Sequence, residues 1–201
     1  VLEEKSLELM KKCIELAQDL GVRTIQLAGY DVYYEEKSPQ TRQRFIKNLR
    51  KACDWAEEAQ VVLAIEIMDD PFINSIEKYL AVEKDVDSPY LFVYPDIGNV
   101  SAWHNDVYSE FYLGHHAIAA LHLKDTYAVT ESSKGQFRDV PFGQGCVKWE
   151  EAFDILKQTN YNGPFLIEMW SENCETVEET RAAIQEAQAF LYPLIKKAGL
   201  M

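Results

Sequence analysis

Four apolar runs in the sequence each give way to an ionisable side chain of a type that binds metal ions: Glu66, Asp96, His122 and Glu168. Three carboxylates that meet away from water repel one another and take up protons. A divalent cation between them keeps them ionised. One nitrogen and three carboxylate oxygens suit Mn²⁺ or Mg²⁺, and Zn²⁺ or Co²⁺ also accept such a set. These residue types therefore predict one divalent-metal site.

Each of the four residues also has an ordinary structural interpretation. Glu66 could lie half exposed at a strand end, and Asp96 could shape a turn. His122 could be a hydrogen-bonded core histidine, and Glu168 could pair with a neighbouring lysine. However, all four occur at the same relative position in four consecutive strand–helix units. This recurrence favours the metal site over four unrelated structural roles.

Two hydrophobic periods alternate along the chain and define the elements that must position these residues. Helical spacing predicts helices over 2–20, from Pro39 to about 56, and over about 74–86, 106–113, 149–158 and 176–197. Ser38 and Pro39 form a preferred N-cap and first-turn pair. Short apolar runs predict five strands, over 22–27, 61–67, 90–94, 117–123 and 165–169. These runs are apolar throughout, which is typical of parallel strands that are covered on both faces.

This α/β order allows either an open doubly wound sheet or a β/α barrel. The ligand-type residues favour the barrel, because the C-terminal strand ends of a (β/α)₈ TIM barrel converge on one active site. No low-complexity segment or linker divides the chain, so residues 1–201 are predicted to form a single domain.

Several long segments resemble those of a known family. They are IQLAGYDVYY (25–34), AIEIMD (64–69), YPDIGNVSAW (94–103), LHLKDT (121–126), GQFRDVPFGQG (135–145) and GPFLIEMWSE (163–172). The chain resembles the xylose-isomerase-like (β/α)₈ barrels and, within them, the L-ribulose-5-phosphate 3-epimerases of L-ascorbate degradation. The resemblance covers essentially the whole chain. The four residues that bind the metal in that family correspond to Glu66, Asp96, His122 and Glu168.

The resemblance implies a reaction and a role for each of the four residues. The reaction is epimerisation at C3 between L-xylulose 5-phosphate and L-ribulose 5-phosphate. One divalent ion, Mn²⁺ or Zn²⁺ in the first place with Mg²⁺ or Co²⁺ as alternatives, would stabilise an enediolate. Glu66 and Glu168 would transfer protons on opposite faces of the sugar. Asp96 and His122 would be ligands only, with the second nitrogen of His122 oriented by a further partner.

The phosphate of such a substrate needs local positive charge. The segment after His122 contains four basic residues, and Gly143-Gln-Gly145 stands before a predicted helix, where backbone N–H groups suit an anion. We expect Lys124 and Arg138 to contact the phosphate, since a guanidinium offers a forked contact. Trp103 and Trp170 follow strand ends and are candidates for the walls of the sugar site.

Composition limits the other partners. The chain has 201 residues and a formal net charge of −13, which argues against nucleic acid as a partner. It contains no apolar run of the roughly 20 residues that span a bilayer and no visible signal peptide. Four widely spaced cysteines match no C-x-x-C pattern and indicate reduced thiols. We therefore expect a cytoplasmic protein. As a separate prediction, we expect a homo-oligomer, most simply a dimer.

Two other functions stay open at this point. An aldose–ketose isomerase on the same barrel would move a proton between C1 and C2. A metal-dependent nuclease would need more ligands and a basic surface, and the net charge of −13 argues against it.

The strand count raises a third alternative, an inactive fragment. A full barrel has eight strands and about 250 residues, whereas the sequence predicts five strands. The ligand-bearing strands resemble the fifth to eighth of the family, so the resemblance implies a C-terminal five-βα portion that lacks the first three strands. We expect this chain either to be part of a longer protein or to associate with a partner that covers its open edges.

Overall fold

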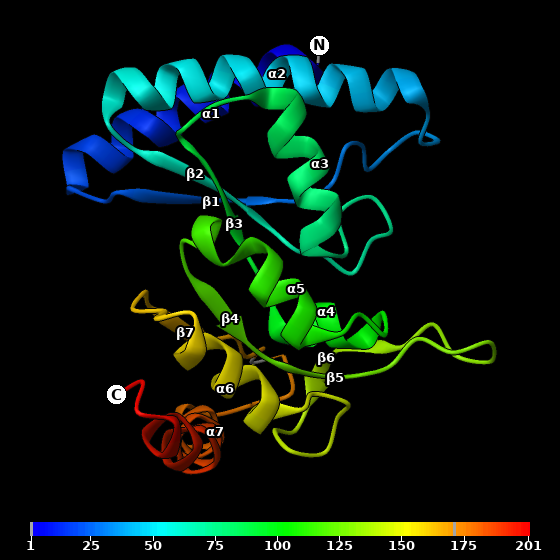
Figure 1. Cartoon of the computed structure of the whole chain (residues 1–201), viewed down its shortest axis with the longest axis vertical. Coiled ribbons are helices and arrows are strands. Elements are labelled where there is room, and N and C mark those ends of the chain that lie inside the picture. The colour runs from blue at the N-terminus through cyan, green and yellow to red at the C-terminus, as the bar shows by residue number, and fades with distance from the viewer. Residues whose placement is uncertain (1, 171) are drawn as a thin grey trace.

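Five parallel strands form the framework of the protein in this computed structural model, which describes residues 2–170 and 172–201 (Figure 1). They are β1 (Thr24–Ala28), β2 (Val62–Glu66), β3 (Leu91–Tyr94), β4 (Leu121–Leu123) and β7 (Phe165–Ile167). β1, β2 and β3 pair in order, and β4 pairs with β7. Bridges from Val93 to Ile118 and from Asp96 to His122 join β3 to β4. All five predicted strands are thereby confirmed, in the order of the sequence.

The helices alternate with these strands, as predicted. They are α1 (Leu2–Leu20), α2 (Pro39–Ala59), α3 (Ile76–Val86), α4 (Ile97–Ala102), α5 (Val107–Gly114), α6 (Trp149–Gln158) and α7 (Val177–Ala198), with a 3₁₀ turn at His115–Ala117. Ser38 and Thr41 form a capping box at the start of α2. Side chains of Ser75, Asp106 and Thr176 cap α3, α5 and α7. These local signals explain why most predicted helix boundaries lie within a few residues of the observed ones.

The middle strands β2, β3 and β4 are buried on both faces, and their side chains alternate between two environments, whereas the outer strands β1 and β7 keep exposed positions. Leu63 and Ile65 of β2 belong to the main core together with the helices, whereas Ala64 packs with Tyr94 and Ala120 in a smaller cluster. The same alternation directs Glu66, at the end of β2, to the side of the sheet that carries the small cluster. This face of the sheet therefore carries Ala64, Tyr94 and Ala120, with Glu66 at the C-terminal end of β2.

Two elements in the middle of the chain were not predicted. The segment after His122 was expected to be irregular, but it contains an antiparallel hairpin of β5 (Asp125–Tyr127) and β6 (Gln136–Val140). The short helix α4 directly follows β3. A Cβ added at Gly98 of α4 would lie only 2.6 Å from the Lys124 carbonyl oxygen. Glycine at position 98 therefore lets α4 pack directly against the chain at Lys124.

Within the part of the chain that the structure describes, the longest helices are too polar or too short to serve as a membrane span.

Candidate metal and acid–base site

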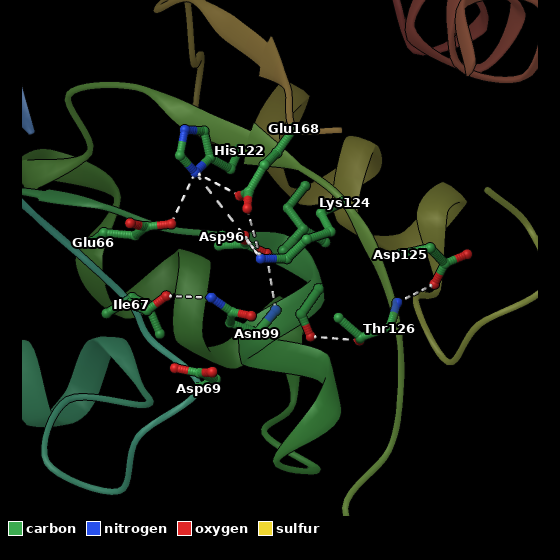
Figure 2. A network of polar contacts seen from close by, with 12 residues as sticks. Glu66, Ile67, Asp69, Asp96, Asn99, His122, Lys124, Asp125, Thr126 and Glu168 are labelled. Carbon is green, nitrogen blue, oxygen red and sulfur yellow. Dashed lines mark hydrogen bonds and ion pairs between the residues drawn. The ribbon is translucent and has the colours of Figure 1, made fainter. Parts of the chain in front are cut away.

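The four predicted ligand residues converge at the C-terminal ends of the strands (Figure 2). Glu66 ends β2, His122 lies in β4, Asp96 caps α4 just after β3, and Glu168 directly follows β7. One ligand atom from each side chain lies within 4.8 Å of the corresponding atoms of the other three. Four residues from separate parts of the sequence are thus placed as one cluster by parallel strand pairing.

His122 lies at the centre of the cluster. Its Nδ1 is 2.9 Å from Glu66 Oε1 and 3.0 Å from Glu168 Oε2, and 4.0 Å from Asp96 Oδ2. The ring also packs on Tyr94, with 4.6 Å between the ring centroids. Burial lowers the pKa of His122, but the close carboxylates of Glu168 and Glu66 outweigh it and raise the pKa to about 9. Without a metal ion, the imidazolium therefore supplies positive charge to the carboxylates.

The pKa values of Asp96 and Glu168 shift in opposite directions. Burial raises the pKa of Asp96, against the opposing charge of Lys124. Burial also opposes ionisation of Glu168, but the close approach of His122 and Asp96, together with the charge of Lys124, outweighs it and lowers the pKa of Glu168. This divergence is the mutual repulsion expected of carboxylates that share a poorly hydrated site.

The donor set fits a divalent cation. Within the described part of the chain, Asp96 Oδ2 and Glu168 Oε2 are buried and make no contact with hydrogen-bond geometry, although cationic groups lie close to both. Buried oxygens normally have such partners, and a metal ion would supply one for both atoms. The three carboxylates with one imidazole nitrogen are also an O,O,O,N set that Mn²⁺, Mg²⁺, Zn²⁺ or Co²⁺ accepts.

Lys124 belongs to the same cluster. Its side chain is buried, with Nζ 2.7 Å from Asp96 Oδ2 and 3.2 Å from Glu168 Oε1. Burial lowers the pKa of Lys124, but Asp96 and Glu168 raise it further than burial lowers it. The strand period contained this information, because Lys124 follows His122 by two positions and so lies on the same face.

Gln26 of β1 is a polar group at the site that the sequence analysis missed. Its amide donates a hydrogen bond to Glu66 Oε2, while Oε1 of the same carboxylate faces His122. A polar residue in the middle of an apolar strand was the available signal. Gln26 therefore holds one oxygen of Glu66 and leaves the other directed to the cluster.

Arg138 lies on β6, and its guanidinium stacks over the ring of Trp170 at 3.8 Å from the centroid. Trp170 follows the proposed ligand Glu168 by two positions in the sequence. The side chain of Arg138 is exposed. Its assignment as a phosphate contact stays a prediction, as does a partner for the second nitrogen of His122.

The glycine segment 143–145 does not present free N–H groups to an anion. The N–H groups of Gly143 and Gly145 donate to Asp125 Oδ2, at 2.8 and 3.1 Å. Our expectation that this segment helps bind phosphate is therefore corrected. The anion that its amides hold is a carboxylate of the protein itself.

The chain is similar to several known proteins. Residues 1–194 match the family model described as xylose isomerase-like TIM barrel. A Haemophilus influenzae protein named as a candidate L-ribulose-5-phosphate 3-epimerase, SgbU, is 51% identical over 200 residues, or 100% of this chain and 69% of that protein. The L-ribulose-5-phosphate 3-epimerase UlaE of Escherichia coli O157:H7 is 47% identical over 197 residues, or 98% of this chain and 66% of that protein.

A solved structure shares the fold at lower sequence identity. The xylose isomerase domain protein from Planctomyces limnophilus superposes with a TM-score of 0.78 at 21% identity, over 98% of this chain and 67% of that chain. The chain thus spans about two thirds of the length of the proteins it matches.

Proposed function

The chain belongs to the xylose isomerase-like TIM barrel family, and from that premise we propose that it catalyses the metal-dependent 3-epimerisation of L-ribulose 5-phosphate and L-xylulose 5-phosphate. The observation that carries the proposal is the convergence of Glu66, Asp96, His122 and Glu168 within 4.8 Å. Relatives with 47–51% identity that are named for this activity support the choice of substrate.

The proposed chemistry assigns a separate task to each side chain. All four residues would hold one divalent ion, Mn²⁺ or Zn²⁺ in the first place with Mg²⁺ or Co²⁺ as alternatives. That ion supplies Lewis-acid stabilisation of the negative charge that develops on the sugar oxygens O2 and O3. Asp96 and His122 serve as ligands only.

Glu66 and Glu168 carry out the proton transfer. One carboxylate accepts the proton from C3, and the electron pair of that C–H bond moves toward the neighbouring carbonyl. The other carboxylic acid then donates a proton to C3 from the opposite face, which inverts the configuration. The substrate epimer decides which of the two is the base. The two side chains come from β2 and the end of β7, on either side of His122 in Figure 2.

The phosphate contact is proposed for Arg138 beside Trp170. The indole ring holds the guanidinium flat by a cation–π contact, so its forked N–H groups are oriented before the substrate binds. The phosphate role expected of Lys124 is left out of the proposal, because Asp96 and Glu168 already engage its ammonium group.

The cellular setting is also proposed. Four free cysteines agree with a cytoplasmic location. A homodimer and a place in L-ascorbate degradation remain predictions of the resemblance.

Epimerisation in D₂O tests the proposed function. The product of L-xylulose 5-phosphate should carry deuterium at C3, and removal of divalent ions should abolish the exchange. Deuterium at C1 or C2 would indicate the alternative aldose–ketose isomerase. Glu66→Gln and Glu168→Gln should each lower the rate by about a hundredfold to ten-thousandfold, whereas Glu131→Gln, at an exposed position, should not. Wild-type rates in both site variants would contradict the acid–base assignment.

A further inference from the structure

Lys124 is a cation built into a cluster that otherwise attracts cations. It is 7% exposed, and it is the only Lys or Arg among the described residues that is buried. Burial of a charged ammonium group is costly unless it is paired. Both of its partners, Asp96 at 2.7 Å and Glu168 at 3.2 Å, belong to the proposed metal ligands.

The position of Lys124 is determined by the backbone around it. The chain from His122 to Lys124 is extended, so both side chains lie on the same face. On the other side, Gly98 of α4 packs against the Lys124 carbonyl, and the Thr126 hydroxyl donates to the Gly98 carbonyl at 2.8 Å. The ammonium group is therefore held at the cluster rather than free to leave it for the solvent.

With all three carboxylates ionised, as metal binding favours, the charges of the cluster add up to a definite value. Glu66, Asp96 and Glu168 contribute three negative charges when ionised, and Lys124 contributes one positive charge. With His122 as a neutral ligand, the net charge is −2. One divalent ion neutralises this charge, whereas a trivalent ion leaves an excess of one positive charge in a poorly hydrated site.

We propose that Lys124 is a positioning residue that holds Asp96 and Glu168 in place and sets the charge of the centre, so that the site selects divalent over trivalent cations. This inference rests on the metal site of the proposed function. The repulsion between Lys124 and a bound ion grows with the charge of the ion. It therefore disfavours a trivalent ion more than a divalent one, at equal distance.

Lanthanide competition measures this selectivity directly. Tb³⁺ binding is followed by its luminescence, and Mn²⁺ binding by displacement of Tb³⁺ and by calorimetry, in the wild-type protein and in Lys124→Met. Methionine keeps an unbranched stem and removes the charge. The ratio of the dissociation constants, Mn²⁺ over Tb³⁺, should rise at least tenfold in Lys124→Met. A purely structural defect would weaken both ions alike and leave this ratio unchanged.

Three further variants make the result specific. Lys124→Gln should raise the ratio in the same way, and it replaces Lys124→Met if that variant does not fold. Lys124→Arg keeps the charge and should retain the wild-type ratio. Lys134→Met removes the same charge from an exposed position on the hairpin and should also leave the ratio unchanged. An unchanged ratio in the neutral variants, or an equal rise in Lys134→Met, would overturn the inference.

The outcome also separates this inference from the proposed function. If the wild-type protein binds Mn²⁺ and loses it in His122→Ala, but the ratio does not respond to Lys124→Met, the metal site stands and the role of Lys124 is wrong. If the wild-type protein binds neither ion, the metal site itself is wrong, and the role of Lys124 is overturned with it.

Discussion

Asp96 and Asp125 are both buried aspartates, at 0% and 1% exposure, but their surroundings differ in one respect. Asp125 accepts hydrogen bonds from the backbone N–H groups of Thr126, Gly143, Gly145 and Val147 and from the indole of Trp149. Both of its oxygens are thus satisfied by groups that anchor the loop after the hairpin.

Asp96 is satisfied at one oxygen only. Its Oδ1 accepts from the N–H group of Asn99 at 2.9 Å, whereas Oδ2 makes no contact with hydrogen-bond geometry among the described residues and faces Lys124 and the cluster. The comparison shows that burial alone does not identify a functional carboxylate. For this pair, Asp96 directs an oxygen without a hydrogen-bond partner among the described residues to the cluster of ligand residues, whereas the fully bonded Asp125 is a structural anchor.

The largest expected effect is on metal binding. Asp96→Asn removes the charge of a proposed ligand, so the affinity for Mn²⁺ should fall at least a hundredfold, by calorimetry. The folded protein should stay about as stable, because removal of one of three clustered carboxylates relieves repulsion. Asp139→Asn is the matched control, at an exposed position with φ 56° that asparagine also tolerates. Unchanged affinity in Asp96→Asn would remove Asp96 from the metal site.

For the structural anchor Asp125, we expect a loss of stability and little change in metal binding. Asp125→Asn replaces an acceptor for several N–H groups by an amide that can accept at one atom only. The free energy of unfolding should fall by about 3 kcal/mol, measured by urea denaturation, while the affinity for Mn²⁺ changes less than threefold. Loss of metal binding without loss of stability would show that the two aspartates are not functionally distinct.

A smaller effect is expected where a neutral group supports a ligand. Gln26→Leu removes the hydrogen bond to Glu66 Oε2. Partners of this kind are worth about tenfold to a hundredfold in metal affinity, and we expect about tenfold for Mn²⁺. Gln26→Glu adds a fourth carboxylate beside Glu66, so it should weaken binding of the anionic sugar-phosphate substrate. If Gln26→Leu binds Mn²⁺ like the wild type, Glu66 is positioned without its help.

The smallest expected effect is on the pH dependence of stability, and it concerns the ion pair between Asp31 and the surface residue Lys37. Asp31 lies 2.7 Å from Lys37, which also contacts Asp70 at 2.8 Å. Burial raises the pKa of Asp31, but hydrogen bonds from Lys37 and Thr41 outweigh it and lower the pKa. A lowered pKa in the folded state stabilises the protein above the ordinary aspartate pKa of about 4, and this contribution is lost as the pH falls below it.

Lys37→Met should remove that part of the pH dependence. Urea denaturation between pH 3 and pH 6 should show a difference of less than about 1 kcal/mol between Lys37→Met and the wild type at pH 6. The difference should shrink as the pH falls toward 3. A difference that grows at low pH would contradict the assignment of Asp31 as the paired group.

Much of the molecule could be predicted from local sequence signals. Capping residues such as Ser38 and Thr176 act within the first turn of the helix that they start. Their effect can therefore be predicted without knowledge of tertiary contacts. Apolar runs of five to seven residues identified all five parallel strands. The candidate metal ligands could also be predicted from the sequence, because they interrupt or follow those apolar runs: Glu66, Asp96, His122 and Glu168.

The remaining features depend on contacts between distant segments. The helix α4 has six residues and is held by packing against the chain at Lys124, and the two strands of the hairpin are too short for a clear period. The glycines of segment 143–145 had the composition of an anion site. Only the folded structure shows that Asp125 of β5 accepts hydrogen bonds from those N–H groups.

The sequence by itself determined the strands, the helix ends, the family resemblance and the four ligand types, since periodicity, capping and residue chemistry are local properties. Only the tertiary structure places the ammonium group of Lys124 against Asp96 and Glu168. It also places the Gln26 amide against Glu66, and the Asp125 carboxylate against the N–H groups of segment 143–145. Each of these pairings joins groups from different elements, and the energy of a charge or a hydrogen bond in a buried site depends on which partners the fold brings within reach.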